Sequence, residues 1–312
     1  MNESLSRRDL LKKSVKIGAA VGGASLLGYG IYSFMKRDRI EDLYGTYPES
    51  ASRYDLRIIN KNAPRPNIIF ILCDDLGYGD IGCYGGKAIH TPNIDSLAST
   101  GTRFTSYYTC NAVCAPSRAG LLTGRYPFRT GVIGNPYPKH EPMAPIMARK
   151  VGYALKDLGV MDIRENYVSL GLDAAEITLA EGLKKAGYRT GMVGKWHLGD
   201  YSQDPARNPL RHGFDRYFGV PHSNDMPPCP LYRDETMLEA DIGTNQARLT
   251  GMYTNEALKF IDESGGSPFF LYLANTFPHQ PIHASERFLK KSRARIYGDA
   301  VEEIDWEVGE IL

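Results

Sequence analysis

Three apolar runs of strand length stand out along the chain, at residues 67–73, 190–193 and 268–274. An uninterrupted apolar run of this length is typical of a strand that is buried on both faces of a sheet. The segments between the runs carry apolar residues at helical spacing. Because strands and helices alternate, the pattern predicts an α/β fold with a mostly parallel, mixed central sheet sandwiched by helices.

Four segments between and after these runs have the signals of helices. Thr91 is placed to cap the first helix, with Pro92 in its first turn. Thr178 and Glu181 form a capping box at the start of the second helix. Apolar residues line one face of the other two segments. The predicted helices cover residues 92–100, 178–186, 249–261 and 301–312, whereas an insertion or substrate loop is expected over 134–171 and further loops over 200–245.

Polar residues follow each of the three predicted strands directly. Asp74 and Asp75 follow the first strand, Lys195 and His197 the second, and His279 the third. In an open α/β sheet, ligands bind beyond the carboxyl ends of the strands. We therefore expect these residues to converge on one site, although a lone histidine or lysine after a strand is more often structural.

The first 35 residues have the composition of a targeting segment. Arg7 and Arg8 precede an apolar, glycine-rich stretch over 15–34, and this order resembles a twin-arginine export motif. The stretch is close to the length that spans a bilayer, so an uncleaved anchor is the alternative to a signal. We expect the twin-arginine translocase as a partner and a protein that is periplasmic or anchored facing outside the cytoplasm. The expected organisation is a signal or anchor over 1–35, a linker over 36–65 and a catalytic domain over 66–312.

Composition sets few limits on function. The chain has 312 residues, a formal net charge of +1 and 42% hydrophobic residues, which is ordinary for a globular protein. A net charge this close to zero gives no reason to expect a nucleic acid as the partner. The five cysteines are sparse and show no metal-binding spacing, and they permit disulfides without requiring them.

Cys114 is the candidate nucleophile, at the start of a short predicted helix. Pro116 suits the first helical turn, and Gly124 is placed to end the helix. The backbone at a helix N-terminus favours anions, and Arg118 adds a permanent positive charge one turn further on. For a cysteine taken alone, a buried or redox role is the usual alternative.

The twelve residues from Cys114 to Arg125, Cys-Ala-Pro-Ser-Arg-Ala-Gly-Leu-Leu-Thr-Gly-Arg, resemble the signature of the sulfatase family. In that family a maturation enzyme oxidises the cysteine to Cα-formylglycine, whose hydrated aldehyde attacks sulfur. The resemblance covers residues from about Pro66 to Leu312 except 134–171, and it is of the arylsulfatase A and N-acetylgalactosamine-6-sulfatase type. It implies a sulfuric ester hydrolase of alkaline-phosphatase-like fold that acts on aryl or sugar sulfates.

The same resemblance implies roles for the residues that follow the strands. Asp74 and Asp75, with the modified Cys114, match the family's calcium ligands, and adjacent carboxylates suit a hard cation such as calcium or, alternatively, magnesium. In Gly-Lys-Trp-His-Leu-Gly, Lys195 would bind sulfate oxygens and His197 would act as general base.

Two further residues complete the site that the resemblance implies. His279, within Pro-His-Gln-Pro, matches the histidine that assists the leaving group, and it would also bind substrate. Ser223 matches a serine that helps to bind substrate. Together with calcium, Arg118 and Lys195 would neutralise the charge that develops on sulfate during transfer.

The family pattern continues beyond the last residue of this chain. In sulfatases a strand ending in Asp-Asn-Gly supplies further calcium ligands, and another active-site lysine and a smaller domain follow. The sequence stops inside a predicted helix at Leu312, so we expect a C-terminally truncated domain with a half-complete calcium site. Two alternatives to an active sulfatase stay open: a phosphodiester or phosphonate ester hydrolase of the same superfamily, and a truncated fragment that binds sulfate esters without turnover.

Overall fold

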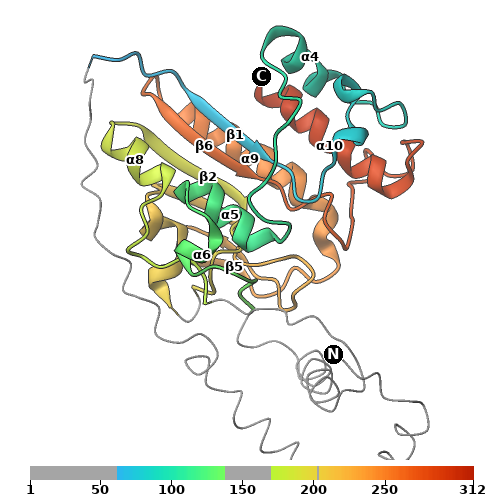
Figure 1. Ribbon diagram of the computed structural model, residues 1–312. Coiled ribbons are helices and arrows are strands. Elements are labelled where there is room, and N and C mark those ends of the chain that lie inside the picture. Colours follow the sequence, from blue (N-terminus) through green and yellow to red (C-terminus); the bar gives the residue numbers. More distant parts are fainter. Residues whose placement is uncertain (1–61, 138–169, 202–203) are drawn as a thin grey trace, which may run out of the picture. The chain divides into compact units, whose positions relative to one another are not determined.

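A six-stranded sheet forms the centre of the computed structural model, which describes residues 62–137, 170–201 and 204–312 (Figure 1). All of these residues belong to the same compact unit. Within this described part, no helix is both long enough and apolar enough to cross a bilayer. The expected export segment over 1–35, nearly all of the linker over 36–65 and most of the stretch over 134–171 lie outside the described residues.

The sheet is mixed and mostly parallel, as the sequence predicts. The strand order is β1-β6-β2-β3-β4-β5, in which β1, β6, β2 and β3 run parallel and β4 and β5 are antiparallel to their neighbours. The strands are β1 Ile68–Leu72, β2 Arg189–Lys195, β3 Arg216–Val220, β4 Leu231–Arg233, β5 Thr236–Glu239 and β6 Phe269–Ala274.

Helices cover both faces of the sheet. The helices are α4 Pro92–Thr100, α5 Cys114–Thr123, α6 Pro127–Thr130, α8 Leu179–Lys185, α9 Leu249–Glu263 and α10 Arg295–Ile311. Short 3-10 helices cover Tyr78–Asp80, Gly82–Tyr84, Pro205–Arg207, Pro209–His212 and Asn245–Arg248. Side chains of α5 and α8 belong to one hydrophobic core, and side chains of α9 and α10 belong to a second one. The predicted helix–sheet–helix sandwich is therefore confirmed.

Strand β6 shows why two cores form. Its side chains alternate, so that Phe270 and Tyr272 belong to the core with α5 and α8, whereas Phe269, Leu271 and Leu273 belong to the core with α9 and α10. All six residues of the strand are buried. A continuous apolar run is the expected sequence of a strand that is covered on both faces.

Two predictions about the sheet are wrong in part. Strand β1 is not buried on both faces: among the described strands it pairs with β6 alone, and Ile69 is 36% exposed. An apolar run does not reveal whether its strand lies at the centre or at an edge. Residues 200–245 are not only loops, because β3, β4 and β5 lie within them. These strands have three to five residues, which is too short for a clear period.

The start of α4 corrects another prediction, whereas the start of α8 confirms one. The Thr91 side chain makes no capping hydrogen bond to α4. The carboxylate of Asp305, on α10, instead accepts hydrogen bonds from the backbone N–H groups of Asn93 and Ile94 at 3.2 and 2.8 Å. At α8, Thr178 and its partner three residues on form the predicted capping box.

Candidate active site

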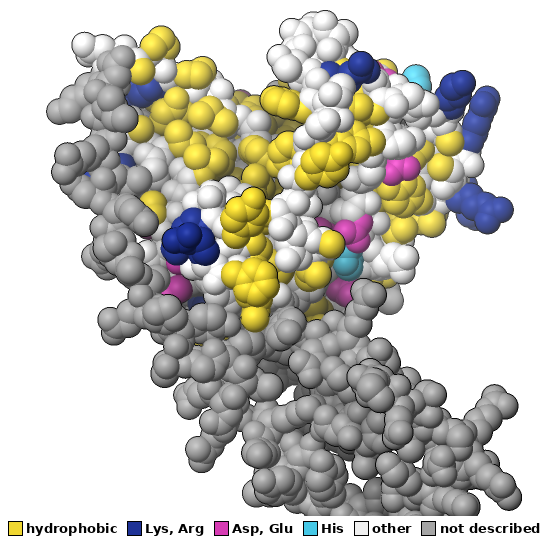
Figure 2. Space-filling view, viewed as in Figure 1, with side chains coloured by type: hydrophobic (Ala, Val, Ile, Leu, Met, Phe, Trp, Pro, Cys, Tyr) yellow, Lys and Arg dark blue, Asp and Glu magenta, His cyan; other side chains and the backbone are white. Residues whose placement is uncertain are grey.

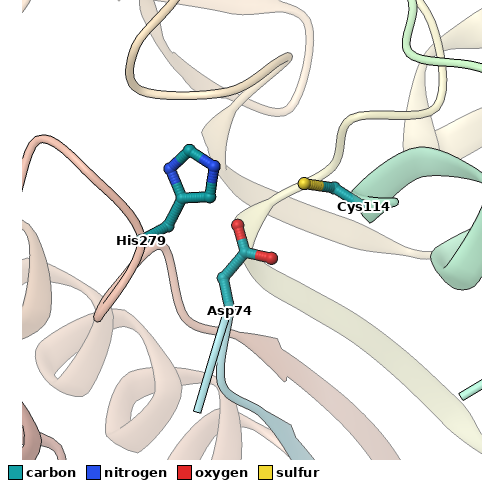
Figure 3. Close-up of side chains that lie close together, drawn as sticks. All are labelled: Asp74, Cys114 and His279. Atoms are coloured by element: carbon teal, nitrogen blue, oxygen red, sulfur yellow. The ribbon is translucent and has the colours of Figure 1, made fainter. Parts of the chain in front are cut away.

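The polar residues that follow β1, β2 and β6 meet at one end of the sheet, as their positions in the sequence predict. The centre of the cluster is the buried carboxylate of Asp74, just beyond β1. Lys195, the last residue of β2, donates a hydrogen bond from Nζ to Asp74 Oδ2 at 2.5 Å. The ligand atoms of Asp74, Cys114 and His279 all lie within 4.8 Å of one another (Figure 3).

Two cations share the Asp74 carboxylate. Arg118 Nη2 lies 3.2 Å from Asp74 Oδ1, and Lys195 Nζ bonds the other oxygen. The two cationic side chains are 2% and 0% exposed. Burial alone would raise the pKa of the Asp74 carboxyl, but the two cations hold the pKa below its ordinary value. The carboxylate is therefore ionised at neutral pH.

Helix α5 presents Cys114 and Arg118 on successive turns. Cys114 is its first residue, and Gly124 ends it in the left-handed conformation, as predicted. Ala115 and Ala119 are fully buried, so small residues allow close packing of the helix on the sheet. The helix also receives a side-chain cap that sequence reasoning missed, because Asn135 Oδ1 accepts a hydrogen bond from the Ala115 N–H at 3.1 Å.

The Arg118 guanidinium keeps donor capacity for an anion. Its Nη1 donates to the backbone oxygen of Lys195 at 2.6 Å. Its Nε and Nη2 are buried and have no hydrogen-bond partner within the described part, although Nη2 forms the ion pair with Asp74. Buried donors without partners are costly, and they are common where a ligand completes the bonding.

His197 is fully buried, and neither ring nitrogen has a hydrogen-bond partner among the described residues. Its backbone has φ 56°, a conformation that is uncommon for non-glycine residues and that clusters at active sites. Burial, reinforced by the charges of Lys195 and Arg118, holds the pKa of His197 well below its ordinary value. The imidazole is therefore neutral at physiological pH and can accept a proton.

Ser223 and His279 complete the cluster. The hydroxyl oxygen of Ser223 accepts a hydrogen bond from Lys195 Nζ at 2.8 Å. The side chain of His279 is 15% exposed, and its Nε2 lies 3.9 Å from Asp75 Oδ2. A hydrogen bond to the Cys114 thiol raises the pKa of His279, against the opposing effect of burial. This contribution belongs to the unmodified cysteine.

The predicted metal ligands are split between the interior and the surface. Asp75 has φ 70° and a side chain that is 64% exposed, whereas Asp74 is buried. Figure 2 shows acidic side chains next to a histidine side chain on one face of the molecule. Two adjacent carboxylates fit a hard divalent cation in donor type. The sulfur of Cys114 and the ring nitrogen of His279 are softer donors that suit zinc better.

The structure also reveals two site residues that the sequence analysis did not select. Asn224 Oδ1 lies 3.1 Å from His279 Nδ1, and Gln246 bonds the Asn224 side chain. Asn224 directly follows Ser223, so the sequence already placed it near the site. No signal pointed to Gln246, because its approach depends on how the loops after β3 and β5 fold together.

Comparison with known proteins identifies the family. Residues 66–312 match the Sulfatase family model, and the chain belongs to the sulfatase family. It is 40% identical to N-acetylgalactosamine-6-sulfatase of Rattus norvegicus over 280 residues, which cover 82% of this chain and 48% of that protein. It is 34% identical to arylsulfatase G of Rattus norvegicus, in a match that covers 80% of this chain and 48% of that protein. The chain thus spans about half the length of these relatives.

Solved structures share the alkaline-phosphatase-like α/β fold. One, from a Bacteroides thetaiotaomicron locus for the metabolism of multiple glycosaminoglycans, has a TM-score of 0.65 at 29% identity and covers 80% of this chain and 58% of its own. BT4656, in complex with its substrate D-glucosamine-2-N,6-O-disulfate, has a TM-score of 0.51 at 26% identity. The match covers 72% of this chain and 37% of BT4656. The phosphonate monoester hydrolase of Agrobacterium radiobacter shares the fold alone, with a TM-score of 0.50 at 16% identity. The match covers 79% of this chain and 58% of the hydrolase.

Proposed function

We propose that this protein hydrolyses sulfate esters through a formylglycine that a maturation enzyme makes from Cys114. The observation that carries the proposal is the buried cluster in which Lys195 and Arg118 share the Asp74 carboxylate beside Cys114 and His279. Buried cations with free donors are the groups that a tetrahedral oxyanion needs. In members of the family, the aldehyde hydrate at this position supplies the hydroxyl that attacks sulfur.

The two cations would bind and polarise the sulfate group. Arg118 presents a planar fork of donors, of which Nε has no partner and Nη2 has only its ion pair with Asp74 in the described part. Lys195 adds a compact charge, held in place by Asp74 and Ser223. Because both cations are buried, they need little reorganisation when negative charge develops on the sulfate oxygens.

The two histidines would move protons at different stages. His197 is neutral and buried, so it would take a proton from the nucleophile's remaining hydroxyl when sulfate is released. His279 lies at the exposed side of the cluster, where the alcohol part of the ester would depart. It would donate a proton or a hydrogen bond to that departing oxygen.

A divalent cation, calcium in the first place, would be held by Asp74 and Asp75. When bound, it would add positive charge beside the sulfate oxygens. Lys195 and Arg118 pair with the same Asp74 carboxylate, so the metal ion would share it with them.

The substrate that we favour is a sulfated sugar. The relatives and structures at 26–40% identity include an N-acetylgalactosamine-6-sulfatase, a protein from a glycosaminoglycan locus and a complex with a glucosamine disulfate. Aromatic side chains between α4 and α5 also favour sugar rings: Phe104, Tyr107 and Tyr108 are 65, 50 and 82% exposed. Figure 2 shows hydrophobic side chains gathered over this part of the face.

The proposal is tested by producing the chain together with a formylglycine-generating enzyme. Mass spectrometry of the tryptic peptide 104–118 should show the conversion of the thiol to the aldehyde, and the Cys114→Ala variant is the inactive control. Hydrolysis is compared on 4-nitrophenyl sulfate, a 6-sulfated amino sugar and bis-4-nitrophenyl phosphate. Faster hydrolysis of the phosphate diester would support the phosphodiesterase alternative. Binding of the sugar sulfate by converted protein without hydrolysis would support the non-catalytic alternative.

We further propose that residues 1–35 direct export by the twin-arginine translocase and either are removed or stay as an anchor. The support is the order of Arg7, Arg8 and the apolar stretch over 15–34. Residues 36–65 would then link this segment to the catalytic domain over 66–312. Replacing both arginines by lysine should retain the protein in the cytoplasm, as measured by cell fractionation. Unchanged export of that variant would exclude the twin-arginine route.

A further inference from the structure

Asn224 Oδ1 lies 3.1 Å from His279 Nδ1. Figure 3 shows one ring nitrogen of His279 turned toward Cys114 and the other turned away from it. We propose that Asn224, oriented by Gln246, is a positioning residue that holds the His279 ring with Nδ1 protonated and Nε2 directed at the departing oxygen. This role rests on the proposed function, because Asn224 and Gln246 would support the step in which His279 assists the departing oxygen. Within the described part of the chain, neither residue of the pair forms a hydrogen bond with the cation cluster of Asp74, Lys195 and Arg118.

The orientation of the Gln246 amide is set by two backbone carbonyls. Its Nε2 donates hydrogen bonds to the backbone oxygens of Asn224 and Gly243, both at 3.0 Å. A carbonyl oxygen only accepts, so the amide nitrogen must face this pair. Gln246 is 3% exposed, which leaves no water to compensate for a reversed amide. Its Oε1 therefore faces the other way, toward the Asn224 side chain.

The orientation of Asn224 follows from that of Gln246. Asn224 Nδ2 donates to Gln246 Oε1 at 3.0 Å and to the backbone oxygen of Pro281 at 3.2 Å. Both of its N–H groups are then used, and Asn224 is only 4% exposed. Its Oδ1 must point at His279, where it can only accept a hydrogen bond.

His279 Nδ1 is thus surrounded by acceptors. Asn224 Oδ1 lies 3.1 Å away and the backbone oxygen of Gln280 lies 2.5 Å away. Two acceptors require a proton on Nδ1, so in the neutral ring Nε2 carries the lone pair, and in the charged ring Nε2 carries the transferable proton. Figure 3 shows a ring nitrogen of His279 turned toward Cys114, where the ester would lie. Without Asn224, one of the two contacts that define this orientation is lost.

Loss of this hydrogen-bond network should slow the hydrolysis of some sulfate esters much more than that of others. An ester with a poor leaving group, such as an alkyl sugar sulfate, needs a proton on the departing oxygen, whereas 4-nitrophenolate leaves without one. Loss of a hydrogen-bond partner that orients a metal-ligating histidine typically lowers activity about 10- to 100-fold, and we take the same range for His279. We expect Asn224→Ala to lower kcat/KM by that factor on the sugar sulfate and by less than about threefold on 4-nitrophenyl sulfate.

The experiment compares five variants of the converted full chain with the wild type on both substrates. Asn224→Asp keeps an acceptor toward Nδ1 and should recover part of the loss of Asn224→Ala. The double variant Asn224→Ala/His279→Ala should be no slower on the sugar sulfate than His279→Ala alone. Asn275→Ala is the matched control: this buried asparagine bonds Glu307 at 2.5 Å, and any loss should be equal on the two substrates. An equal loss for Asn224→Ala on both substrates would overturn the inference.

A spectroscopic measurement separates this inference from the proposed function. If wild-type protein hydrolyses neither substrate, the proposed function fails, but the orientation of His279 can still be read from histidine ¹⁵N shifts. The signal is assigned by its disappearance in His279→Gln. We expect the Nδ1–H tautomer in the neutral ring of the wild type and a mixture of tautomers in Asn224→Ala. The same tautomer in both proteins would contradict the positioning role.

Discussion

Lys195 Nζ lies 2.5 Å from Asp74 Oδ2, although the two residues are 121 positions apart in the chain. The contact joins the ends of β1 and β2, which are separated in the sheet by β6. One buried carboxylate therefore pairs with two buried cations, Lys195 and Arg118. A divalent cation at Asp74 would have to share this carboxylate with both cations.

Calcium held by Asp74 and Asp75 would bind the folded protein and not the unfolded chain, so it should stabilise the protein, and the effect should depend on both aspartates. At a calcium concentration about 100 times its Kd, linkage predicts roughly 2.7 kcal/mol of added stability. Thermal unfolding in EDTA, calcium, magnesium and zinc measures this effect. Asp74→Asn and Asp75→Asn should abolish it, whereas Asp262→Asn, on α9, should keep it. Stabilisation by zinc alone would instead indicate a site made by Cys114 and His279.

Replacement of His197 should remove the general base without removing substrate binding. Loss of a general base typically lowers kcat about 10²- to 10⁴-fold. His197→Ala in converted protein should show this loss on any sulfate ester, with KM changed much less. His212 is the matched control, because it is also fully buried with both ring nitrogens unbonded in the described part, but it packs against Trp196. If His212→Ala lowered kcat per folded molecule equally, the assignment of His197 would be wrong.

Gly194 should not tolerate a side chain. Its φ is 112°, and an added Cβ would lie 2.0 Å from the backbone oxygen of Ala274 on β6. Gly194→Ala would force apart the strands that carry Lys195 and His279, so we expect a loss of stability of more than about 2 kcal/mol and a loss of activity. Gly251, in the first turn of α9, has no neighbouring atom outside its own helix backbone within 4 Å of an added Cβ. Gly251→Ala should instead stabilise by about 0.5–1 kcal/mol, measured by denaturant unfolding.

Glu307 should make stability fall as the pH rises toward 8. Burial raises the pKa of Glu307 to about 8, although Asn275 bonds its carboxyl group. Because the folded-state pKa exceeds the unfolded one, the native state binds more protons between about pH 4.5 and 8. The stabilisation is complete below the unfolded pKa and disappears as the pH passes the folded pKa, with a maximum of roughly 5 kcal/mol.

The isosteric Glu307→Gln variant should flatten this dependence. The Thr254 hydroxyl already donates to the backbone oxygen of Thr250 at 2.8 Å, so its 3.3 Å contact with Glu307 suits a neutral partner. Unfolding free energies at pH 5.5 and 7.5 measure the slope. Glu310→Gln, an exposed change on the same helix, should keep the wild-type slope, and an unchanged slope in Glu307→Gln would show that Glu307 is ionised in the folded state.

Asp305 should stabilise α4, although it lies more than two hundred positions further along the sequence. Its carboxylate accepts hydrogen bonds from the backbone of Asn93 and Ile94, as an N-cap side chain does. Asp305→Ala should cost about 1–2 kcal/mol, measured by denaturant unfolding. The control is Glu310→Ala, whose exposed carboxylate bonds only Trp306 in the described part and should change stability by less than about 0.5 kcal/mol. Equal effects would mean that the cap contributes nothing.

Local signals in the sequence proved reliable wherever the deciding contact is itself local. The capping box of Thr178 and Glu181, the glycine end of α5 at Gly124 and the buried run of β6 all appear as predicted. In each case the interacting groups are a few residues apart, or the whole segment has one character. The same holds for the polar residues beyond the strands, since parallel strands carry their carboxyl ends to one edge.

Sequence reasoning failed where the deciding partner is remote. Thr91 has the composition of a cap, yet Asp305 caps the helix, because α10 packs beside α4 and brings its carboxylate there. The gap in the site prediction has the same cause. Asn224 reaches His279 only because the loops beyond β3 and β6 meet, and Gln246 orients it from a third segment.

The amino-acid sequence alone was enough to recognise the family signature at Cys114 and to predict the α/β class. It was also enough to place Asp74, Lys195 and His279 at the ends of strands, because all three findings follow from spacing along the chain. The tertiary structure alone decided that β1 lies at an edge of the described sheet, that Lys195 and Arg118 share Asp74, and that His197 is buried and neutral. Those properties depend on which segments exclude water from one another, and water is excluded only when distant parts of the chain pack together.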